Sequence, residues 1–229
     1  IDPNTRHELE ELVERVRADD PAALRELEDR FSAPLEFGTA GLRGVVAAGE
    51  NRMNRSVVVR ATHGLATEVS KRIAAARTRG IVIGRDGRTD SATFQRDATE
   101  VCAASGLRVH AFDEPVPTPV VAFAVRHLCA AAGVVVTASH NPPSYNGYKV
   151  YWENGAQIIP PVDRQIADAI AAAPCAREVP RMPIDEARAC GLVGSATATE
   201  RAYLEALDAL RFVDDAPVRD LRIAYSALH

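Results

Sequence analysis

The sequence lacks any stretch that would place the chain in a membrane. No run approaches the roughly 18 uninterrupted apolar residues of a membrane-spanning helix, and the opening residues, Ile1 to Asn4, do not resemble a signal peptide. An excess of charge is also missing. A net charge of −4 gives no reason to expect nucleic acid or an anionic membrane surface as a partner. We therefore expect a protein that binds neither.

Cysteine is scarce and scattered. The four cysteines among 229 residues (Cys102, Cys129, Cys175 and Cys190) show neither the spacing of metal ligands nor that of a redox pair. A hydrophobic content of 47% and a charged content of 25% lie in the ordinary range of globular domains. These features predict a folded protein of the reducing cytoplasm and leave its oligomeric state open.

Lysine is rarer still. Of 27 basic residues only Lys71 and Lys149 are lysine, and the other 25 are arginine. Lysine can give up a proton near neutral pH once its pKa is lowered, whereas arginine cannot. An ammonium group retained at Lys149, ten residues after Ser139, therefore favours a chemical role over chance.

One loop carries the strongest chemical signal. The apolar run from Gly133 to Val136 predicts a short buried strand, and the sequence TASHNPP follows at residues 137–143. Proline cannot continue a strand and restricts the residue before it, so Ser139 and His140 are predicted on a sharp loop at the strand's end. A doubly wound sheet places its chemistry at such a loop.

Strands and helices are predicted to alternate along the chain. We expect strands at 80–84, 107–112, 133–136 and 147–152, the last joined by an Asn-Gly turn to a second hairpin strand at 156–159, and another strand from 221 to 225. We expect helices at 7–18, 21–30, 58–73, 90–105, 118–129, 162–172 and 199–210, with Asp20, Asn54 or Ser56, Asp90 and Thr118 as candidate caps. This alternation predicts an α/β fold with a mixed, mostly parallel sheet flanked by helices.

Four motifs resemble those of the α-D-phosphohexomutases, enzymes that move phosphate between two positions of a sugar. They are FGTAGLRG at 37–44, GRDGR at 84–88, TASHNPPSYNGYK at 137–149 and YWENGAQI at 151–158. The last resembles the branch that contains phosphoglucomutase-2, phosphopentomutase and some bacterial phosphomannomutases. TASH alone would be a weak signal, whereas four motifs in the family's order are a specific one.

The resemblance implies a phosphoserine mechanism. Ser139 would carry a phosphate, pass it to a sugar phosphate to give a sugar bisphosphate, and recover it from the other position. The family's pattern assigns catalytic roles to Ser139, His140, Lys149 and Arg43, and phosphate binding to Thr39, Gly41, Arg43 and Lys149. It also implies one Mg²⁺ ion, held by the phosphate on Ser139 and by an aspartate-rich loop beyond His229.

The role of Lys149 in this mechanism is left open, and three other features are expected to have structural roles only. Lys149 could serve as general base or acid only if its pKa fell, and a neighbouring phosphate raises that pKa, so its role could instead be to neutralise charge. The loop at 84–88 is expected to hold a structural arginine–aspartate pair. Asn141 and Asn146 are expected to shape the turn.

The chain is expected to divide into four parts. Residues 1–34 are predicted as an N-terminal helical extension and 35–173 as domain I of the family, with the phosphoserine loop. Residues 174–198 are predicted as a linker, since three prolines and little periodicity mark the start of this interval. Residues 199–229 would begin a second α/β domain. We expect the chain to be an N-terminal portion of a longer mutase and to show no mutase turnover alone.

Two other classes of function are weighed against the mutase. A non-catalytic α/β module that binds a sugar phosphate would have no need to carry phosphate on Ser139. A serine hydrolase would need a third triad member, and no aspartate-based triad is evident. The sugar handled by a mutase, whether glucose, mannose or a pentose, is left open by these residues.

Overall fold

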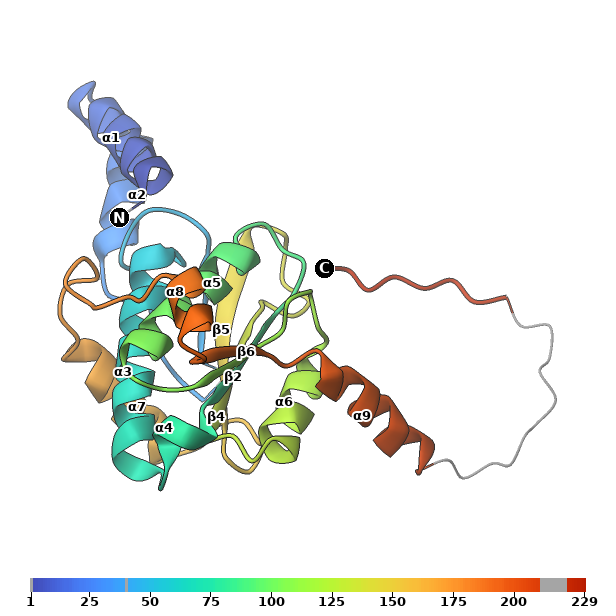
Figure 1. The fold of residues 1–229 in the computed structure, drawn as a ribbon. Coiled ribbons are helices and arrows are strands. Elements are labelled where there is room, and N and C mark those ends of the chain that lie inside the picture. Colours follow the sequence, from blue (N-terminus) through green and yellow to red (C-terminus); the bar gives the residue numbers. More distant parts are fainter. Residues whose placement is uncertain (1, 40, 211–221) are drawn as a thin grey trace.

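A six-stranded sheet forms the centre of the molecule (Figure 1). The computed structural model describes residues 2–39, 41–210 and 222–229. The strands are β1 (Leu42–Val45), β2 (Ile81–Arg85), β3 (Val109–Ala111), β4 (Ala132–Val136), β5 (Tyr145–Trp152) and β6 (Val193–Ser195). They lie in the order β1-β5-β4-β2-β3-β6. Strands β4, β2, β3 and β6 are parallel, and β5 runs antiparallel to both β4 and β1.

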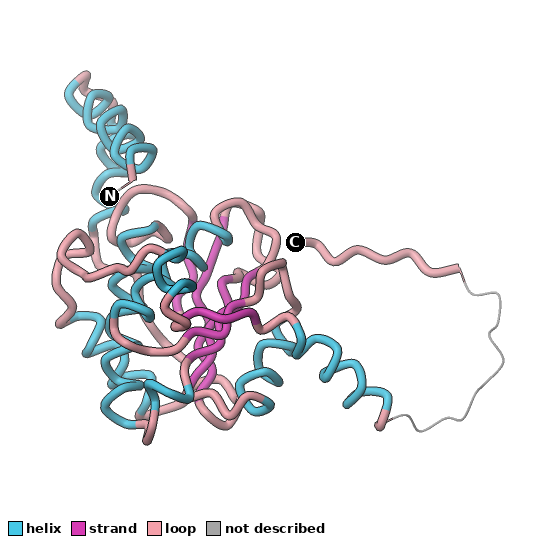
Figure 2. Tube along the Cα trace, in the orientation of Figure 1, coloured by secondary structure: helices cyan, strands magenta, loops and turns pink. Residues whose placement is uncertain are grey.

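Helices cover both faces of the sheet, and Figure 2 shows the strands enclosed between them. One face packs against α3 (Arg55–Arg72), α5 (Ser91–Ala104), α7 (Val162–Ala171) and α8 (Ile184–Ala189), and the other against α6 (Thr118–His127), beside which lies α9 (Ala198–Asp208). The short α4 (Ala76–Arg79) precedes β2, and α1 (Pro3–Arg17) and α2 (Pro21–Phe31) project from one end (Figure 1). The predicted α/β fold with a mixed, mostly parallel sheet is confirmed. No helix in the described ranges is long and apolar enough to cross a membrane.

The central strands are apolar because both of their faces are covered. In β2, Ile81 and Ile83 join the core under α3 and α5, whereas Val82 joins the core under α6. In β4, Val134 and Val135 divide between the two faces in the same way. Parallel strands buried on both sides read as continuous apolar runs, which is the pattern seen at 80–84 and 133–136.

Two of the predicted helix caps are confirmed. The carboxylate of Asp20 accepts hydrogen bonds from the amides of Ala22 and Ala23 at 2.9 and 3.2 Å, and Pro21 opens α2. The side chain of Asn54, rather than that of Ser56, caps α3 by accepting a bond from the Val57 amide across 3.1 Å. Polar side chains beside a proline or an apolar run thus mark these helix starts in the sequence itself.

Two other caps were predicted wrongly. Asp90 occupies the position before α5, but its side chain makes no capping hydrogen bond. The carboxylate of Asp86, four positions earlier, accepts a bond from the Ser91 hydroxyl instead, across 2.6 Å. Thr118 is the first residue of α6, and Pro117 occupies the cap position without a side-chain bond.

The predicted hairpin at 147–159 is only partly present. β5 finds its strand partners in β4 and β1, whereas residues 156–159 form a single bridge, between Gln157 and Tyr151. Two backbone bonds, from Trp152 to Ala156 and from Ile158 to Val150, keep this segment beside β5. Proline at 160 and 161 then prevents a longer ladder, because proline has no amide hydrogen to donate.

Residues 174–198, predicted as a linker, contain structure of their own. They include α8 and β6, and β6 extends the sheet by pairing in parallel with β3, with Val193 opposite Val109. Residues 193–195 of the predicted linker therefore form an edge strand of the sheet. Three residues are too few to show a strand pattern in the sequence. Residues 222–225 form no strand, contrary to the prediction, and Leu221 lies outside the described residues.

Candidate active site

The predicted loop lies at the carboxyl edge of the sheet. β2 and β4 are parallel neighbours, and Arg85 lies opposite Val136 where both strands end. The segment after β4 spans residues 137–144, and the segment after β2 begins at Asp86, whose amide donates to the carbonyl oxygen of Val136 across 3.0 Å. Adjacent loops at the carboxyl ends of parallel strands are the usual ligand position in such sheets.

Ser139 has a left-handed backbone conformation, with a φ of 57°. A residue with a β-carbon adopts this region at a cost of about 1–3 kcal/mol and keeps it only where its surroundings enforce it. Two local bonds contribute here: the Ser139 amide donates to Thr137 Oγ1 across 3.0 Å, and the Asn141 amide donates to the Ala138 carbonyl across 3.1 Å. The sharp loop predicted at this point is confirmed.

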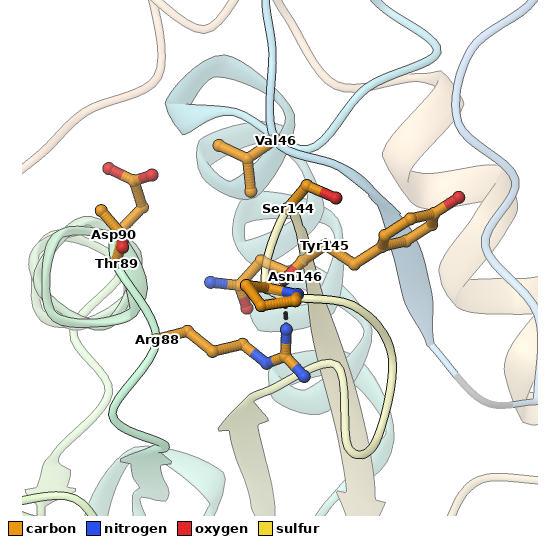
Figure 3. A pocket seen from close by; sticks show the side chains of 8 residues that line it. Val46, Arg88, Thr89, Asp90, Ser144, Tyr145 and Asn146 are labelled. Atoms are coloured by element: carbon orange, nitrogen blue, oxygen red, sulfur yellow. Dashed lines mark hydrogen bonds between the residues drawn. The ribbon is translucent and has the colours of Figure 1, made fainter. Parts of the chain in front are cut away.

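Arg88 binds the loop from below (Figure 3). Its side chain is 1% exposed, and its Nη1 donates to the carbonyl oxygens of Pro142 and Tyr145 at 2.7 and 2.9 Å. Its Nη2 donates to the carbonyl oxygens of Ser139 and Asn141 at 2.9 and 2.7 Å. Arg88 also lines, with Tyr145, a cavity of about 240 Å³ beside the loop. One guanidinium therefore ties together four carbonyl groups of the loop.

The predicted arginine–aspartate pair is confirmed and is part of a longer chain of bonds. Arg88 Nε donates to Asp86 Oδ2 across 3.2 Å, and the other oxygen of Asp86 accepts from the Ser91 hydroxyl. Asn146, which is buried, donates from Nδ2 to Ser91 Oγ across 3.0 Å. Its Oδ1 accepts from the Gly147 amide. Asp86 therefore orients Arg88, and Asn146 shapes the turn as expected.

Lys149 lies on β5, beside the end of β4. It pairs with Val135 in the antiparallel ladder, and its side chain is half-buried. Burial lowers the pKa of Lys149 below its ordinary value, the nearby Arg43 guanidinium lowers it further, and the Asp86 carboxylate opposes the change. The direction is the one that a lysine general base requires.

Arg43 reaches the same loop from the opposite edge of β5. It lies on β1, opposite Gly147 of β5, and its exposed side chain donates from Nη1 to Asn141 Oδ1 across 3.2 Å. A β-carbon at Gly147 would lie 2.6 Å from the Thr137 carbonyl oxygen and 2.8 Å from that of Leu42. The absence of a side chain at Gly147 thus allows the loop and β1 to approach each other.

The remaining predicted site residues, His140, Thr39 and Gly41, differ in solvent exposure. His140 follows Ser139 and is exposed. Thr39 is exposed in the turn between Gly38 and Gly41, whose backbones bond to each other. Gly41 is buried with a φ of 78°, and a β-carbon there would lie 1.9 Å from the Tyr148 carbonyl oxygen. Gly41 therefore has a structural reason to be glycine, and the phosphate-binding roles of Thr39 and Gly41 stay predictions.

The structure adds residues to this site that the sequence patterns did not assign to it. The bonds from Arg88 to the loop carbonyls and the link through Ser91 join residues more than 50 positions apart. The GRDGR motif pointed to the correct loop, but not to the side chain that binds the neighbouring loop. No local pattern specifies such a partner.

A comparison with known protein families shows which family the chain belongs to. Residues 34–175 match the phosphoglucomutase/phosphomannomutase α/β/α domain I. The chain belongs to this family. The match ends where the segment with α8 and β6 begins, so it covers the sheet strands β1 to β5 and the whole candidate site.

Individual relatives fall in the mutase branch expected from the fourth motif. The chain is 44% identical to the human phosphopentomutase over 151 residues, which is 63% of this chain and 25% of that protein. It is 40% identical to the mouse glucose 1,6-bisphosphate synthase over 174 residues, or 73% of this chain and 27% of that protein. The chain thus spans about a quarter of the length of these relatives.

A solved structure agrees with the fold. A protein from Thermus thermophilus, assigned as a phosphomannomutase, superposes with a TM-score of 0.63 at 32% sequence identity. The superposition covers 78% of this chain and 36% of the Thermus chain. The likeness therefore extends over most of the chain and over a minor part of the larger protein.

The described residues do not form a metal site by themselves. Members of the family generally use Mg²⁺, but no group of three or more His, Cys, Asp or Glu side chains in residues 2–39, 41–210 and 222–229 could hold a metal ion. Asp86, the carboxylate next to the loop, is engaged by Arg88 and Ser91.

Proposed function

We propose that this chain forms the phosphate-carrying domain of a phosphosugar mutase, in which Ser139 bears the phosphate. The observation that carries the proposal is the convergence of three elements on one loop. Ser139 occupies a left-handed turn at the end of β4, Arg43 of β1 bonds to Asn141 of the same loop, and Lys149 of β5 lies close enough to Arg43 for its pKa to be lowered by it.

The proposed reaction is transfer of phosphate between two positions of one sugar. A hydroxyl oxygen of the sugar phosphate attacks the phosphorus on Ser139, a new oxygen–phosphorus bond forms, and the bond to Ser139 Oγ breaks. The hydroxyl proton leaves to a base while Ser139 Oγ takes up a proton. After the sugar bisphosphate has turned around, Ser139 Oγ gives its proton to a base and attacks the phosphorus of the other phosphate. The bond from that phosphorus to the sugar oxygen breaks, the sugar oxygen takes up a proton, and the chain regains its phosphoserine.

The neighbouring residues suit the needs of this transfer. Phosphoryl transfer requires positioning and neutralisation of charge more than covalent chemistry by the protein. Arg43 offers a forked donor for the phosphate oxygens, and its exposed side chain makes a single bond of 3.2 Å that a ligand can replace. His140 would act as a further donor. Lys149 is the proposed proton acceptor, or the neutralising charge if the phosphate keeps it protonated.

The relatives support a sugar-phosphate substrate of one of two sizes. Their names include a phosphopentomutase and a glucose 1,6-bisphosphate synthase. We propose interconversion of a sugar 1-phosphate with its 6-phosphate, or of a pentose 1-phosphate with its 5-phosphate, through the bisphosphate. Because the chain spans about a quarter of these relatives, this activity is proposed for the protein that contains the domain.

Phosphate mapping tests the proposal. The intact mass of the protein, purified from the cells that make it, is measured first, followed by peptide mapping across residues 134–149. We expect one phosphate, on Ser139. The variant Ser139→Ala should lack it, whereas Ser144→Ala, which changes an exposed serine of the same loop, should retain it.

The same samples discriminate the other classes of function. Sugar-phosphate conversion is assayed with Mg²⁺ on the longest form of the protein that contains this chain. An unphosphorylated Ser139, with conversion that is unaffected by Ser139→Ala, would overturn the proposal. Sugar-phosphate binding without phosphorylation would indicate the non-catalytic module, and ester hydrolysis that Ser139→Ala abolishes would indicate the hydrolase.

A further inference from the structure

Arg88 is the most completely bonded arginine at the site. A guanidinium has five N–H donors, and Arg88 makes five side-chain bonds: one from Nε to Asp86 and two each from Nη1 and Nη2 to loop carbonyls. The side chain is 1% exposed, and that of Asp86 is 11% exposed. Such a group has no donor to spare for a substrate, so its function must lie in what it binds.

The four carbonyls that Arg88 binds span the reactive turn. They belong to Ser139, Asn141, Pro142 and Tyr145, so the bonds enclose a seven-residue stretch that begins with the candidate phosphate carrier. The left-handed conformation of Ser139 persists only where the surrounding structure over-determines it. Arg88 supplies that constraint on the carboxyl side of Ser139, because Nη2 holds the Ser139 carbonyl itself.

We propose that Arg88 is a positioning residue that holds Ser139 in its left-handed turn and thereby directs the phosphate carried there towards Arg43 and Lys149. The part concerning the phosphate rests on the proposed function, whereas the part concerning the backbone does not. Asn141 links Arg88 to Arg43, since its carbonyl oxygen accepts a bond from Arg88 and its side-chain oxygen accepts one from Arg43.

Lysine should be unable to replace Arg88. Its single ammonium nitrogen is a compact point charge, whereas the planar guanidinium presents a rigid fork of donors. The carbonyls are bound here by two different nitrogens, Nη1 and Nη2. Arg88→Lys therefore keeps the positive charge and loses the geometry, so any effect of this variant reports position rather than charge.

Arg79 provides a matched control at the other end of the sheet. It also binds carbonyl oxygens, those of Cys129 and Ala130 at 2.8 and 3.2 Å, and a carboxylate, that of Glu153 at 2.8 Å. Arg79→Lys thus removes the same kind of multiple contact without touching the Ser139 loop. An effect that follows from loss of any such arginine would appear in both variants.

The first measurement is hydrogen exchange on the 229-residue chain. The amides of Ser139, Asn141 and Tyr145 each donate a bond within the loop. In Arg88→Lys we expect these amides to exchange about ten-fold faster or more, with the exchange of α3 unchanged, because only the loop opens. In Arg79→Lys they should exchange as in the parent chain. Exchange that rises equally in α3 would show global destabilisation and would overturn the proposal.

The second measurement uses phosphoserine installed at position 139 during translation. Its second pKa, about 6 in a free peptide, is followed by ³¹P NMR. We expect a lowered pKa in the parent chain and in Arg79→Lys, because Arg43 and Lys149 favour the dianion, and a return towards the free value in Arg88→Lys. Unchanged titration in Arg88→Lys, even with faster exchange, would mean that Arg88 only stabilises the loop and would overturn the proposal.

Failure of this inference and failure of the proposed function give different results. If Ser139 is never phosphorylated in cells, the exchange difference between Arg88→Lys and Arg79→Lys is still expected, since it concerns the backbone alone. If Ser139 is phosphorylated but Arg88→Lys alters neither exchange nor titration, the mutase proposal stands and the role of Arg88 is refuted.

Discussion

Arg43 Nη1 donates a hydrogen bond to Asn141 Oδ1 across 3.2 Å and so joins residues that lie 98 positions apart in the chain. Arg88 holds the carbonyl oxygen of the same Asn141 across 2.7 Å. The Arg43 side chain is exposed and makes one bond to the loop, whereas that of Arg88 is buried and fully bonded. The site therefore combines an arginine that can turn to a ligand with one that cannot.

Arg43→Ala is expected to reduce catalysis without reducing stability. In the longer protein that contains this chain, loss of a donor to the transferred phosphate should lower kcat/KM for sugar-phosphate conversion about 100-fold. The free energy of unfolding should change by no more than about 0.5 kcal/mol, because the side chain is exposed. The control is Arg126→Ala, an exposed arginine of α6 outside the site. Equal rates for both variants would exclude Arg43 from phosphate binding.

Lys149→Met is expected to stabilise the unphosphorylated chain at neutral pH. The pKa of Lys149 is lower in the folded state, chiefly through burial, so the unfolded chain binds the proton more tightly. Stability then rises with pH between the folded and unfolded pKa values, and the full penalty is present below both. The gain from Lys149→Met should therefore be largest at about pH 7 and shrink towards about pH 10, near the ordinary pKa of lysine.

Urea unfolding across that pH range measures the effect of Lys149→Met. Lys71→Met is the matched control, because Lys71 is the other lysine of the chain and its side chain is 67% exposed. A constant difference at all pH values, or a loss of stability at neutral pH, would contradict the buried-ammonium explanation. With phosphoserine at 139 the gain should disappear, since the phosphate raises the pKa of Lys149.

Gly41→Ala is expected to displace β1 from β5. The φ of 78° disfavours a side chain, and the new β-carbon would lie 1.9 Å from the Tyr148 carbonyl oxygen. The strained backbone alone should cost about 1–3 kcal/mol of unfolding free energy. At Gly194 no atom lies within 4 Å of an added β-carbon, so Gly194→Ala should stay within about 0.5 kcal/mol. Thermal or urea unfolding of both variants checks this, and equal stabilities would show that β1 can shift freely.

Asp97→Ala is expected to be strongly destabilising. The Asp97 side chain is fully buried in α5 and accepts two bonds from Arg55 of α3, at 2.8 and 2.7 Å. Removing this carboxylate leaves the Arg55 guanidinium, whose side chain is 28% exposed, without its charged partner, at a cost of about 3 kcal/mol. Glu10→Ala breaks the exposed pair with Arg6 and should change stability little in the same urea titration, because solvent screens such a pair. A similar small cost for Asp97→Ala would mean that water readily hydrates Arg55.

Much of the site was predictable because its signals are local. The apolar run before residue 137 and the two prolines after Ser139 require a strand followed by a sharp loop. The position of Lys149 follows from the period of two along β5, which also places Tyr151 on the same face. The chemical roles of these residues rest on the order of four motifs, and they stay proposals until Ser139 has been mapped.

The errors arose where the local residue pattern does not specify the hydrogen-bond partner. Asp90 has the right residue type and position for a cap, yet Asp86 bonds to the first residue of α5 instead. The three residues of β6 show no distinctive pattern, and they form a strand because β3 offers an unpaired parallel edge. Edge pairing is decided by main-chain groups that every residue carries, so side-chain patterns do not reveal it.

By itself the sequence determined the family, the strand–helix alternation, the loop that carries Ser139 and the glycines that let the backbones approach. Tertiary structure alone decided which buried side chain holds that loop, how Ser139 is turned, and how burial and Arg43 lower the pKa of Lys149. The physical reason is the range of the interactions. Turns and strand periods arise between neighbours in the chain, whereas hydrogen bonds and desolvation depend on groups that only the fold brings within a few ångströms.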